Sequence, residues 1–156
     1  MYAMIQTRPD IAFSTSSVSQ WSHNPSEEHE QGAQRILRYL DSTIDYCITY
    51  GGADSEVKLT GYVDANFASD KHTSKSTTSY VFMFNGGAIS WCAKRQATVA
   101  LSSTEAEYIA LCQAAREAAW LRQLLTELGV YNGKPERLPE RDREWQIRRV
   151  MVFCSL

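Results

Sequence analysis

Two carboxylates stand where a sequence of this kind could hold a metal ion. Asp64 ends an apolar alternating run, residues 57–63, and precedes a polar loop. Aspartate is disfavoured within strands, whereas the segments that follow strands often carry functional groups. Glu107 lies in what we predict to be the first turn of a long helix. A strand-end Asp and a helical Glu on a crossing helix can converge on one cation, and hard ions such as Mg²⁺ prefer these oxygen ligands.

Each carboxylate also has a structural interpretation, and the residues alone leave both open. Asp64 equally suits a polar position on the open face of a strand, or the start of an Asx turn. Thr104 with Glu107 matches a helix capping box, as does Ser102 with Glu105. Glu105 is therefore a rival ligand, about 200° around the helix from Glu107. One of the two glutamates must face the sheet and the other must face away from it.

Basic residues lie in the loop after Asp64 and directly after the hairpin that we predict at residues 80–92. They are candidates for contacts with phosphate groups, although most such clusters are simply solvated. The four candidates are Lys71, Lys75, Lys94 and Arg95. We interpret Trp91 as a core residue rather than a platform for base stacking, and His23 and His29 as surface residues.

The composition is that of an ordinary globular domain. The 156 residues are 44% hydrophobic and 22% charged, which excludes a wholly disordered chain. Sixteen basic and eighteen acidic residues give a net charge of -2, so any nucleic-acid binding must come from local patches. No apolar run approaches the ~18 residues of a membrane span. None of the four cysteines forms a Cys-x-x-Cys pair, so we expect free thiols, mostly in the core: Cys47, Cys92, Cys112 and Cys154.

Periodicity predicts helices first and strands afterwards. A helix is expected from Thr7, with Pro9 in its first turn, and a second helix from a cap at Ser26. Residues 46–50 suit a short strand. Three more strands are expected at 57–64, 80–84 and 88–92, the last two joined by a turn at residues 85–87. A long helix then runs to about residue 128 and ends at Gly129.

Four motifs in this order resemble the ribonuclease H domain of copia-type retrotransposon polyproteins. The resemblance covers about residues 57–133, and residues 7–13 and 35–40 are similar to the segment that links reverse transcriptase to that domain. The motifs are Leu59-Thr-Gly-Tyr-Val-Asp64-Ala, Lys75-Ser-Thr-Thr-Ser-Tyr-Val-Phe, Gly87-Ala-Ile-Ser-Trp91 and Thr98-Val-Ala-Leu-Ser-Ser-Thr-Glu-Ala-Glu107-Tyr-Ile-Ala-Leu111.

The resemblance implies an α/β fold in which helices pack on a mixed sheet of five strands. The sheet would begin with a three-stranded antiparallel meander. The resemblance also implies cleavage of the RNA strand of RNA–DNA hybrids by two Mg²⁺ ions held by carboxylates. The hybrid is selected by its shape and by the RNA 2′-hydroxyl groups. Carried over to this chain, Asp64 matches the first aspartate and Glu107 the glutamate, both as catalytic and metal-binding residues, which leaves Glu105 as a helix cap.

The chain departs from the family near its end. The third family carboxylate ends a strand in a Cys-Asp-Asn context, whereas here Cys154 is followed by Ser155. The fourth aspartate and the last helix and strand are also missing. Because two carboxylates hold too little charge for two divalent ions, we expect weak or no magnesium binding and weak or no hydrolysis.

This resemblance and the departure from it predict a ribonuclease H-like fold that is incomplete at its C-terminus and preceded by a helical segment. We expect a connection segment at 1–50, the domain at 51–133, a charged arm foreign to the family at 134–149 and the start of a truncated strand at 150–156. Two alternatives remain, a non-catalytic transposon remnant and a nucleic-acid-binding module. Expected partners are RNA–DNA hybrid, the remaining polyprotein including reverse transcriptase, and a second copy along an exposed sheet edge. An intracellular location follows from the resemblance, either a cytoplasmic particle or the nucleus.

Overall fold

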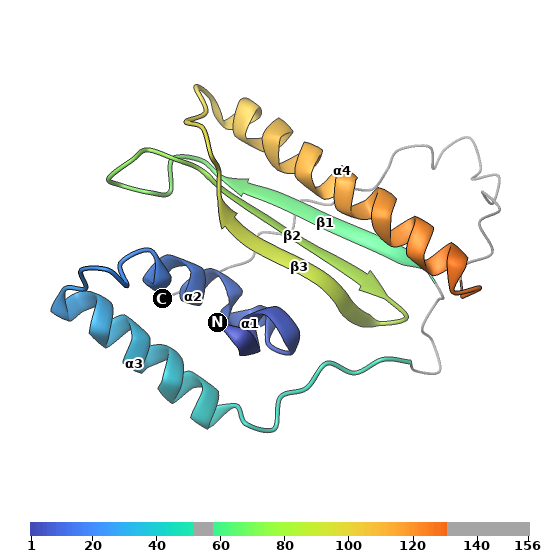
Figure 1. Ribbon diagram of the computed structural model, residues 1–156, viewed down its shortest axis with the longest axis horizontal. Coiled ribbons are helices and arrows are strands. Elements are labelled where there is room, and N and C mark those ends of the chain that lie inside the picture. The colour runs from blue at the N-terminus through green and yellow to red at the C-terminus, as the bar shows by residue number, and fades with distance from the viewer. Residues whose placement is uncertain (52–57, 131–156) are drawn as a thin grey trace.

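The computed structural model describes residues 1–51 and 58–130. In these ranges a three-stranded sheet is covered by a long helix on one face and by short helices on the other (Figure 1). The elements in chain order are α1 (Tyr2–Gln6), the 3-10 helix η1 (Pro9–Ile11), α2 (Ala12–Ser19), α3 (Glu27–Ser42), β1 (Leu59–Asn66), β2 (Thr77–Phe84), β3 (Gly87–Arg95) and α4 (Ser103–Glu127).

The sheet is the predicted antiparallel meander, with strand order β1-β2-β3. In β1, Val63 lies opposite Tyr80 of β2, which in turn lies opposite Cys92 of β3. The β2–β3 turn has positive φ at two successive residues, 50° at Asn85 and 83° at Gly86. That geometry matches the right-handed twist of the strands it joins, which is why an Asn-Gly pair predicted this hairpin correctly.

Helix α4 covers one face of this sheet and makes the core with it. Phe82 of β2 packs against Ala114 and Leu121, and these three side chains are at most 5% exposed. Gly129 follows the helix with φ of 69°, a conformation that glycine adopts at little cost, and so ends the helix as predicted.

The opposite face carries the N-terminal helices. The indole Nε1 of Trp91 donates a hydrogen bond of 2.6 Å to the carbonyl oxygen of Met4, so Trp91 is half-buried against α1 rather than a free platform. The first helix does not begin at Thr7. That residue ends α1, and Pro9 instead begins η1, which continues into α2. Ser26 caps α3 as predicted, with the imidazole of His29 as its capping-box partner.

Residues 46–50 are not a strand, contrary to the sequence prediction. They run past the β2–β3 hairpin and are held by isolated contacts. The N–H of Gly51 donates to the carbonyl of Asn85 at 2.8 Å, and the hydroxyl of Tyr50 donates to the carbonyl of Ala88 at 2.7 Å. Single contacts of this kind do not make the continuous backbone pairing of a strand. The aromatic and β-branched residues at 46–50 nevertheless favoured a strand in the sequence prediction.

The described cysteines are free thiols, as expected, but most are not core residues. Cys47 and Cys112 are exposed, and only Cys92 is half-buried. Burial raises the pKa of the Cys92 thiol, and burial together with the neighbouring Cys92 and Glu117 raises the pKa of Tyr80 to about 12. Both groups are therefore uncharged at neutral pH.

None of the helices in the described ranges combines the length and apolar character that a membrane crossing requires. The mixed α/β class predicted from the sequence is confirmed, as is the meander. The predicted charged arm at 134–149 and strand start at 150–156 lie outside the described residues, and so do Cys154 and Ser155.

Candidate functional site

Asp64 lies near the carboxyl end of β1, opposite Ser79 of β2. Its neighbour Val63 packs with the core under α4. Because side chains alternate along a strand, Asp64 projects from the opposite face. It is half-buried, and within the described ranges its carboxylate accepts no hydrogen bond. The Asx turn that was an alternative explanation of Asp64 therefore does not form.

The start of α4 separates the roles of the two glutamates. The hydroxyl of Ser102 accepts the N–H of Glu105 at 3.1 Å, and the Glu105 carboxylate accepts the N–H of Leu101 at 2.7 Å. Glu105 is thus the capping carboxylate. Since the helix begins at Ser103, Glu107 lies in its second turn rather than the predicted first turn. Glu107 is exposed and has no hydrogen-bond partner among the described residues.

The fold brings both elements to one end of the sheet. Figure 1 shows the carboxyl end of β1 and the amino end of α4 at the same end. In the described ranges, however, no three His, Cys, Asp or Glu side chains gather closely enough to bind a metal ion. Each unpaired carboxylate is a suitable donor to a Mg²⁺ ion that also takes water and phosphate oxygens, but two carboxylates do not suffice for two ions. Because Asp64 projects from the face opposite α4, the described structure does not bring its carboxylate and that of Glu107 onto one ion.

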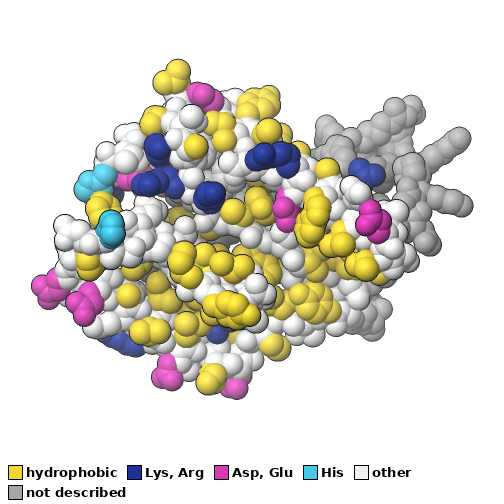
Figure 2. All heavy atoms as spheres, viewed as in Figure 1, with side chains coloured by type: hydrophobic (Ala, Val, Ile, Leu, Met, Phe, Trp, Pro, Cys, Tyr) yellow, Lys and Arg dark blue, Asp and Glu magenta, His cyan; other side chains and the backbone are white. Residues whose placement is uncertain are grey.

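The four basic candidates do not form one patch. Lys94 and Arg95 are consecutive on β3 and therefore project from opposite faces of the sheet. Lys94 lies opposite Thr78, whose hydroxyl accepts a bond from Gln96 under α4. The Nζ of Lys75 donates to the carbonyl of Ala97 at 2.7 Å. On the face that Figure 2 shows, some Lys and Arg side chains lie near the histidines and others are spread across the surface.

Asp70 organises this loop, and sequence reasoning missed it. Its carboxylate accepts the backbone N–H groups of His72 and Thr73 and the hydroxyl of Thr73. It also pairs with Arg95, from Nη1 to Oδ2, at 2.5 Å. The Thr73 hydroxyl, then Arg95 and the N–H of His72, hold the pKa of Asp70 far below its usual value. The signal in the sequence was an Asp two residues before the His, the spacing of an Asx turn.

The same loop forms one wall of a cavity whose other wall is the N-terminal helical segment. The cavity has a volume of about 260 Å³. Trp21 stacks on His29, with ring centroids 4.7 Å apart, and meets His72 edge-on at 5.0 Å. His29 is thus part of a cavity wall, not only a surface residue. The lining residues are Phe13, Ser16, Ser17, Gln20, Trp21, His29, Ser69, Asp70, Lys71, His72, Thr77 and Arg95.

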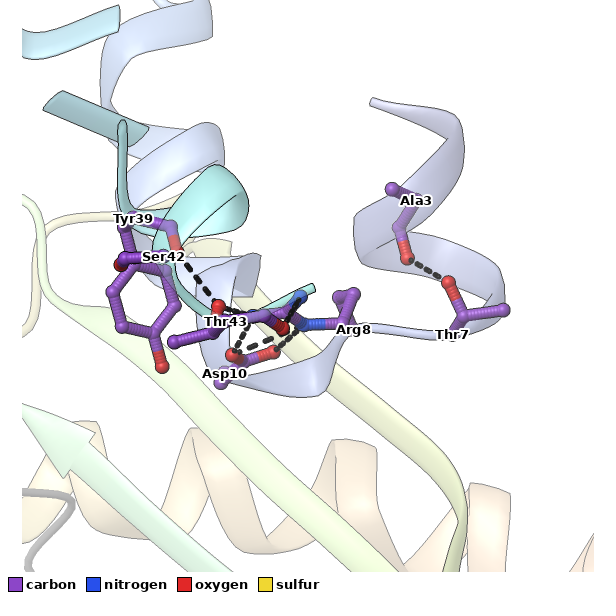
Figure 3. Close-up of polar contacts among 7 residues, drawn as sticks. All are labelled: Ala3, Thr7, Arg8, Asp10, Tyr39, Ser42 and Thr43. Carbon is purple, nitrogen blue, oxygen red and sulfur yellow. Dashed lines mark hydrogen bonds and ion pairs between the residues drawn. The ribbon is translucent and has the colours of Figure 1, made fainter. Parts of the chain in front are cut away.

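An arginine links η1 to α3, the helix that carries His29. Figure 3 shows Arg8 in a bidentate pair with Asp10, the shortest contact being 2.8 Å. The guanidinium also donates to the carbonyl of Thr43 at 3.1 Å and to its hydroxyl at 2.6 Å, and lies 5.6 Å from the ring centre of Tyr39. These contacts join the start of η1 to the end of α3. The sequence predicted a helix start at this motif and gave no indication of the long-range contacts.

Comparison with known proteins shows similarity to one part of retrotransposon Pol polyproteins. Over 131 residues it is 50% identical to the retrovirus-related Pol polyprotein from transposon TNT 1-94 of Nicotiana tabacum, which covers 84% of this chain. Over 129 residues it is 41% identical to the corresponding polyprotein from transposon RE1 of Arabidopsis thaliana. The chain is therefore similar to retrotransposon Pol polyproteins, which supports a retrotransposon-derived fragment. It spans 10% and 9% of these two relatives, so it corresponds to one segment of a Pol polyprotein.

Three further comparisons describe how far this similarity extends. The chain is 48% identical over 121 residues to secreted RxLR effector protein 161 of Plasmopara viticola, and the match covers 84% of that protein and 78% of this chain. No protein-family model matches the chain. No solved structure matches it either. The ribonuclease H-like fold therefore remains a prediction from the resemblance of the motifs.

Proposed function

We propose that this chain is the Pol segment that joins the reverse transcriptase connection to a ribonuclease H-like domain, with Asp64 and Glu107 as the metal-binding carboxylates of that domain. In the whole polyprotein the domain would cleave the RNA strand of RNA–DNA hybrids. The observation that supports this most is the order of elements. An antiparallel meander is followed by a helix packed on it, with Asp64 near the end of the first strand and Glu107 near the start of the helix.

The state of the two carboxylates also supports the proposal. Glu105 is occupied by capping α4, whereas Asp64 and Glu107 accept no hydrogen bond within the described ranges. An unpaired carboxylate remains available to a cation and to substrate. When bound, Mg²⁺ would activate water and stabilise the leaving oxygen. The part of this chain is to supply these two carboxylates, one from β1 and one from α4.

The position that matches the third carboxylate carries Ser155, whose hydroxyl supplies no negative charge. We therefore propose that this chain binds a hybrid with the help of one Mg²⁺ and hydrolyses it weakly or not at all. Binding and hydrolysis are thus separate predictions for this chain. The binding prediction is the one that tests the assignment of Asp64 and Glu107.

The test is the affinity for a fluorescein-labelled RNA–DNA hybrid, measured by anisotropy with and without Mg²⁺. Mg²⁺ should tighten binding by the unaltered chain and should have no such effect on Asp64→Asn or Glu107→Gln. Glu105→Gln is the matched control, because the same change at the helix cap should preserve the Mg²⁺ effect. A Mg²⁺ effect that survives in both Asp64→Asn and Glu107→Gln would refute the assignment.

A non-catalytic nucleic-acid-binding module is the second candidate. The free position of Lys71 and Lys94, whose side chains have no partner among the described residues, favours it. The hydrogen bond of Lys75 to Ala97 and the ion pair of Arg95 with Asp70 count against a nucleic-acid-binding patch made by all four basic candidates. In the same assay this function predicts binding that needs no Mg²⁺ and weakens steeply with added salt.

A further inference from the structure

The cavity between the N-terminal helices and the loop after β1 has the properties of an anion site. Lys71 and Arg95 contribute two positive charges to its lining, and Asp70 contributes the single negative charge. Asp70 is already paired with Arg95 and with the N–H groups of its own turn. The Nζ of Lys71 has no partner within the described ranges, so one cation is left for a ligand.

The remaining lining groups are mostly hydrogen-bond donors. Nδ1 of His29 accepts the backbone N–H of Ser26 at 3.0 Å, which places the proton of the neutral ring on Nε2 and makes that atom a donor. Arg95 uses Nη1 for Asp70 and retains its other N–H groups. Hydroxyl groups of Ser16, Ser17 and Thr77 complete the polar part of the lining.

The volume of the cavity and its aromatic lining indicate which class of ligand it could hold. A volume of about 260 Å³ exceeds what an inorganic anion alone fills and lies just below the range of drug-sized sites. The indole of Trp21 stacks on His29 and meets His72 edge-on, so three aromatic rings lie in the lining beside the cations. Aromatic faces next to positive charge are the usual surroundings of a nucleotide.

We propose that this cavity binds a phosphate group together with its attached sugar or base, with the free charge of Lys71 and the remaining N–H groups of Arg95 on the phosphate and Trp21 beside the organic part. The site lies on the face of the sheet opposite α4 and includes neither Asp64 nor Glu107. It goes beyond the proposed function, since it needs no Mg²⁺ and no hydrolysis. The phosphate comes either from a nucleic-acid strand or from a free nucleotide.

The test uses three probes without Mg²⁺: adenosine 5′-monophosphate, inorganic phosphate and a short single-stranded DNA. Binding is followed by the NMR signal of the Trp21 indole N–H, assigned with a Trp21→Phe variant. We expect adenosine 5′-monophosphate or the DNA to shift this signal at lower concentration than inorganic phosphate. A response to the DNA alone assigns the phosphate to a strand, and a response to the monophosphate alone assigns it to a free nucleotide.

Lys71→Ala should weaken the binding about tenfold, the loss expected for one charge-assisted contact. Lys58→Ala is the matched control, because Lys58 is also exposed but precedes β1 at the other end of that strand. Both lysines are exposed, so neither variant should affect folding. No shift of the Trp21 signal with any probe, or equal losses in the two lysine variants, would overturn the proposal.

Discussion

Gly61 is the position in β1 where a single methyl group should do most damage. It lies opposite Phe82 of β2. A Cβ atom at Gly61 would lie 2.4 Å from Cε1 and 2.8 Å from Cδ1 of the Phe82 ring. Ordinary carbon contacts begin about 1 Å farther out. We therefore predict that Gly61→Ala destabilises the fold and displaces the strand that carries Asp64.

The size of the effect depends on whether the ring can move. Phe82 is 5% exposed and packs against Ala114 and Leu121 of α4, so the ring cannot shift without moving the helix. Overpacking of this kind costs about 1–3 kcal/mol. A loss of about 2 kcal/mol corresponds to a fall in Tm of about 4–8 °C for a chain of this length.

Urea unfolding followed by circular dichroism measures this change in the free energy of unfolding. Gly32→Ala is the control, because a Cβ there meets only Val18 Cγ2, at 3.2 Å, and alanine gains about 0.8–1 kcal/mol over glycine within a helix. Phe82→Leu removes part of the ring, so the double variant should lose less stability than the sum of the single variants. A neutral Gly61→Ala, or strictly additive losses, would refute the steric argument.

Three further predictions concern single contacts. Ser102→Ala should cost about 1 kcal/mol by removing the cap of α4, while Ser103→Ala should change the melting temperature little. Arg8 holds the pKa of Asp10 below its ordinary value, so this pair stabilises the fold at neutral pH. The contribution is lost as pH falls below about 4. In urea unfolding, Asp10→Asn should therefore be less stable than the unaltered chain at neutral pH and less sensitive to acid. Gln96 is 1% exposed, so Gln96→Glu should cost several kcal/mol at neutral pH by burying a charge, a loss that thermal melts should show shrinking in acid.

Each of these predictions has a clear contrary result. Equal melting temperatures for the two serine variants would mean that the Ser102 hydroxyl does not cap the helix. Parallel acid curves for Asp10→Asn and the unaltered chain would show that the pair with Arg8 adds nothing. A Gln96→Glu variant as stable at neutral pH as in acid would place that side chain in water.

Local patterns were sufficient where neighbouring residues determine the structure. The Asn85-Gly86 turn, the alternation in the strands and the Ser102 cap depend on contacts within a few residues, and these elements were predicted correctly. Residues 46–50 were wrong because strand pairing requires a partner edge that composition does not reveal. The helix expected at Thr7 was displaced because α1 precedes it.

The candidate sites show the same division. Asp64 and Glu107 stay predictions from motif resemblance, and Figure 1 shows only that the carboxyl end of β1 and the amino end of α4 lie at the same end of the sheet. The cavity could not be predicted, because Trp21 and His29 are far from Arg95 in sequence and line one cavity with it only through packing of the helices on the sheet. Likewise, Lys94 and Arg95 are adjacent in sequence, yet the strand places them on opposite faces.

Cleavage of an end-labelled RNA–DNA hybrid tests the central claim most directly. The assay compares the unaltered chain and Asp64→Asn, with and without Mg²⁺, on protein shown to be folded. We predict that the unaltered chain binds the hybrid more tightly with Mg²⁺ but cuts the RNA no more than Asp64→Asn does, because Ser155 supplies no third carboxylate. Mg²⁺-dependent cuts that disappear in Asp64→Asn would contradict this, and would show that two family carboxylates suffice or that another residue replaces the third.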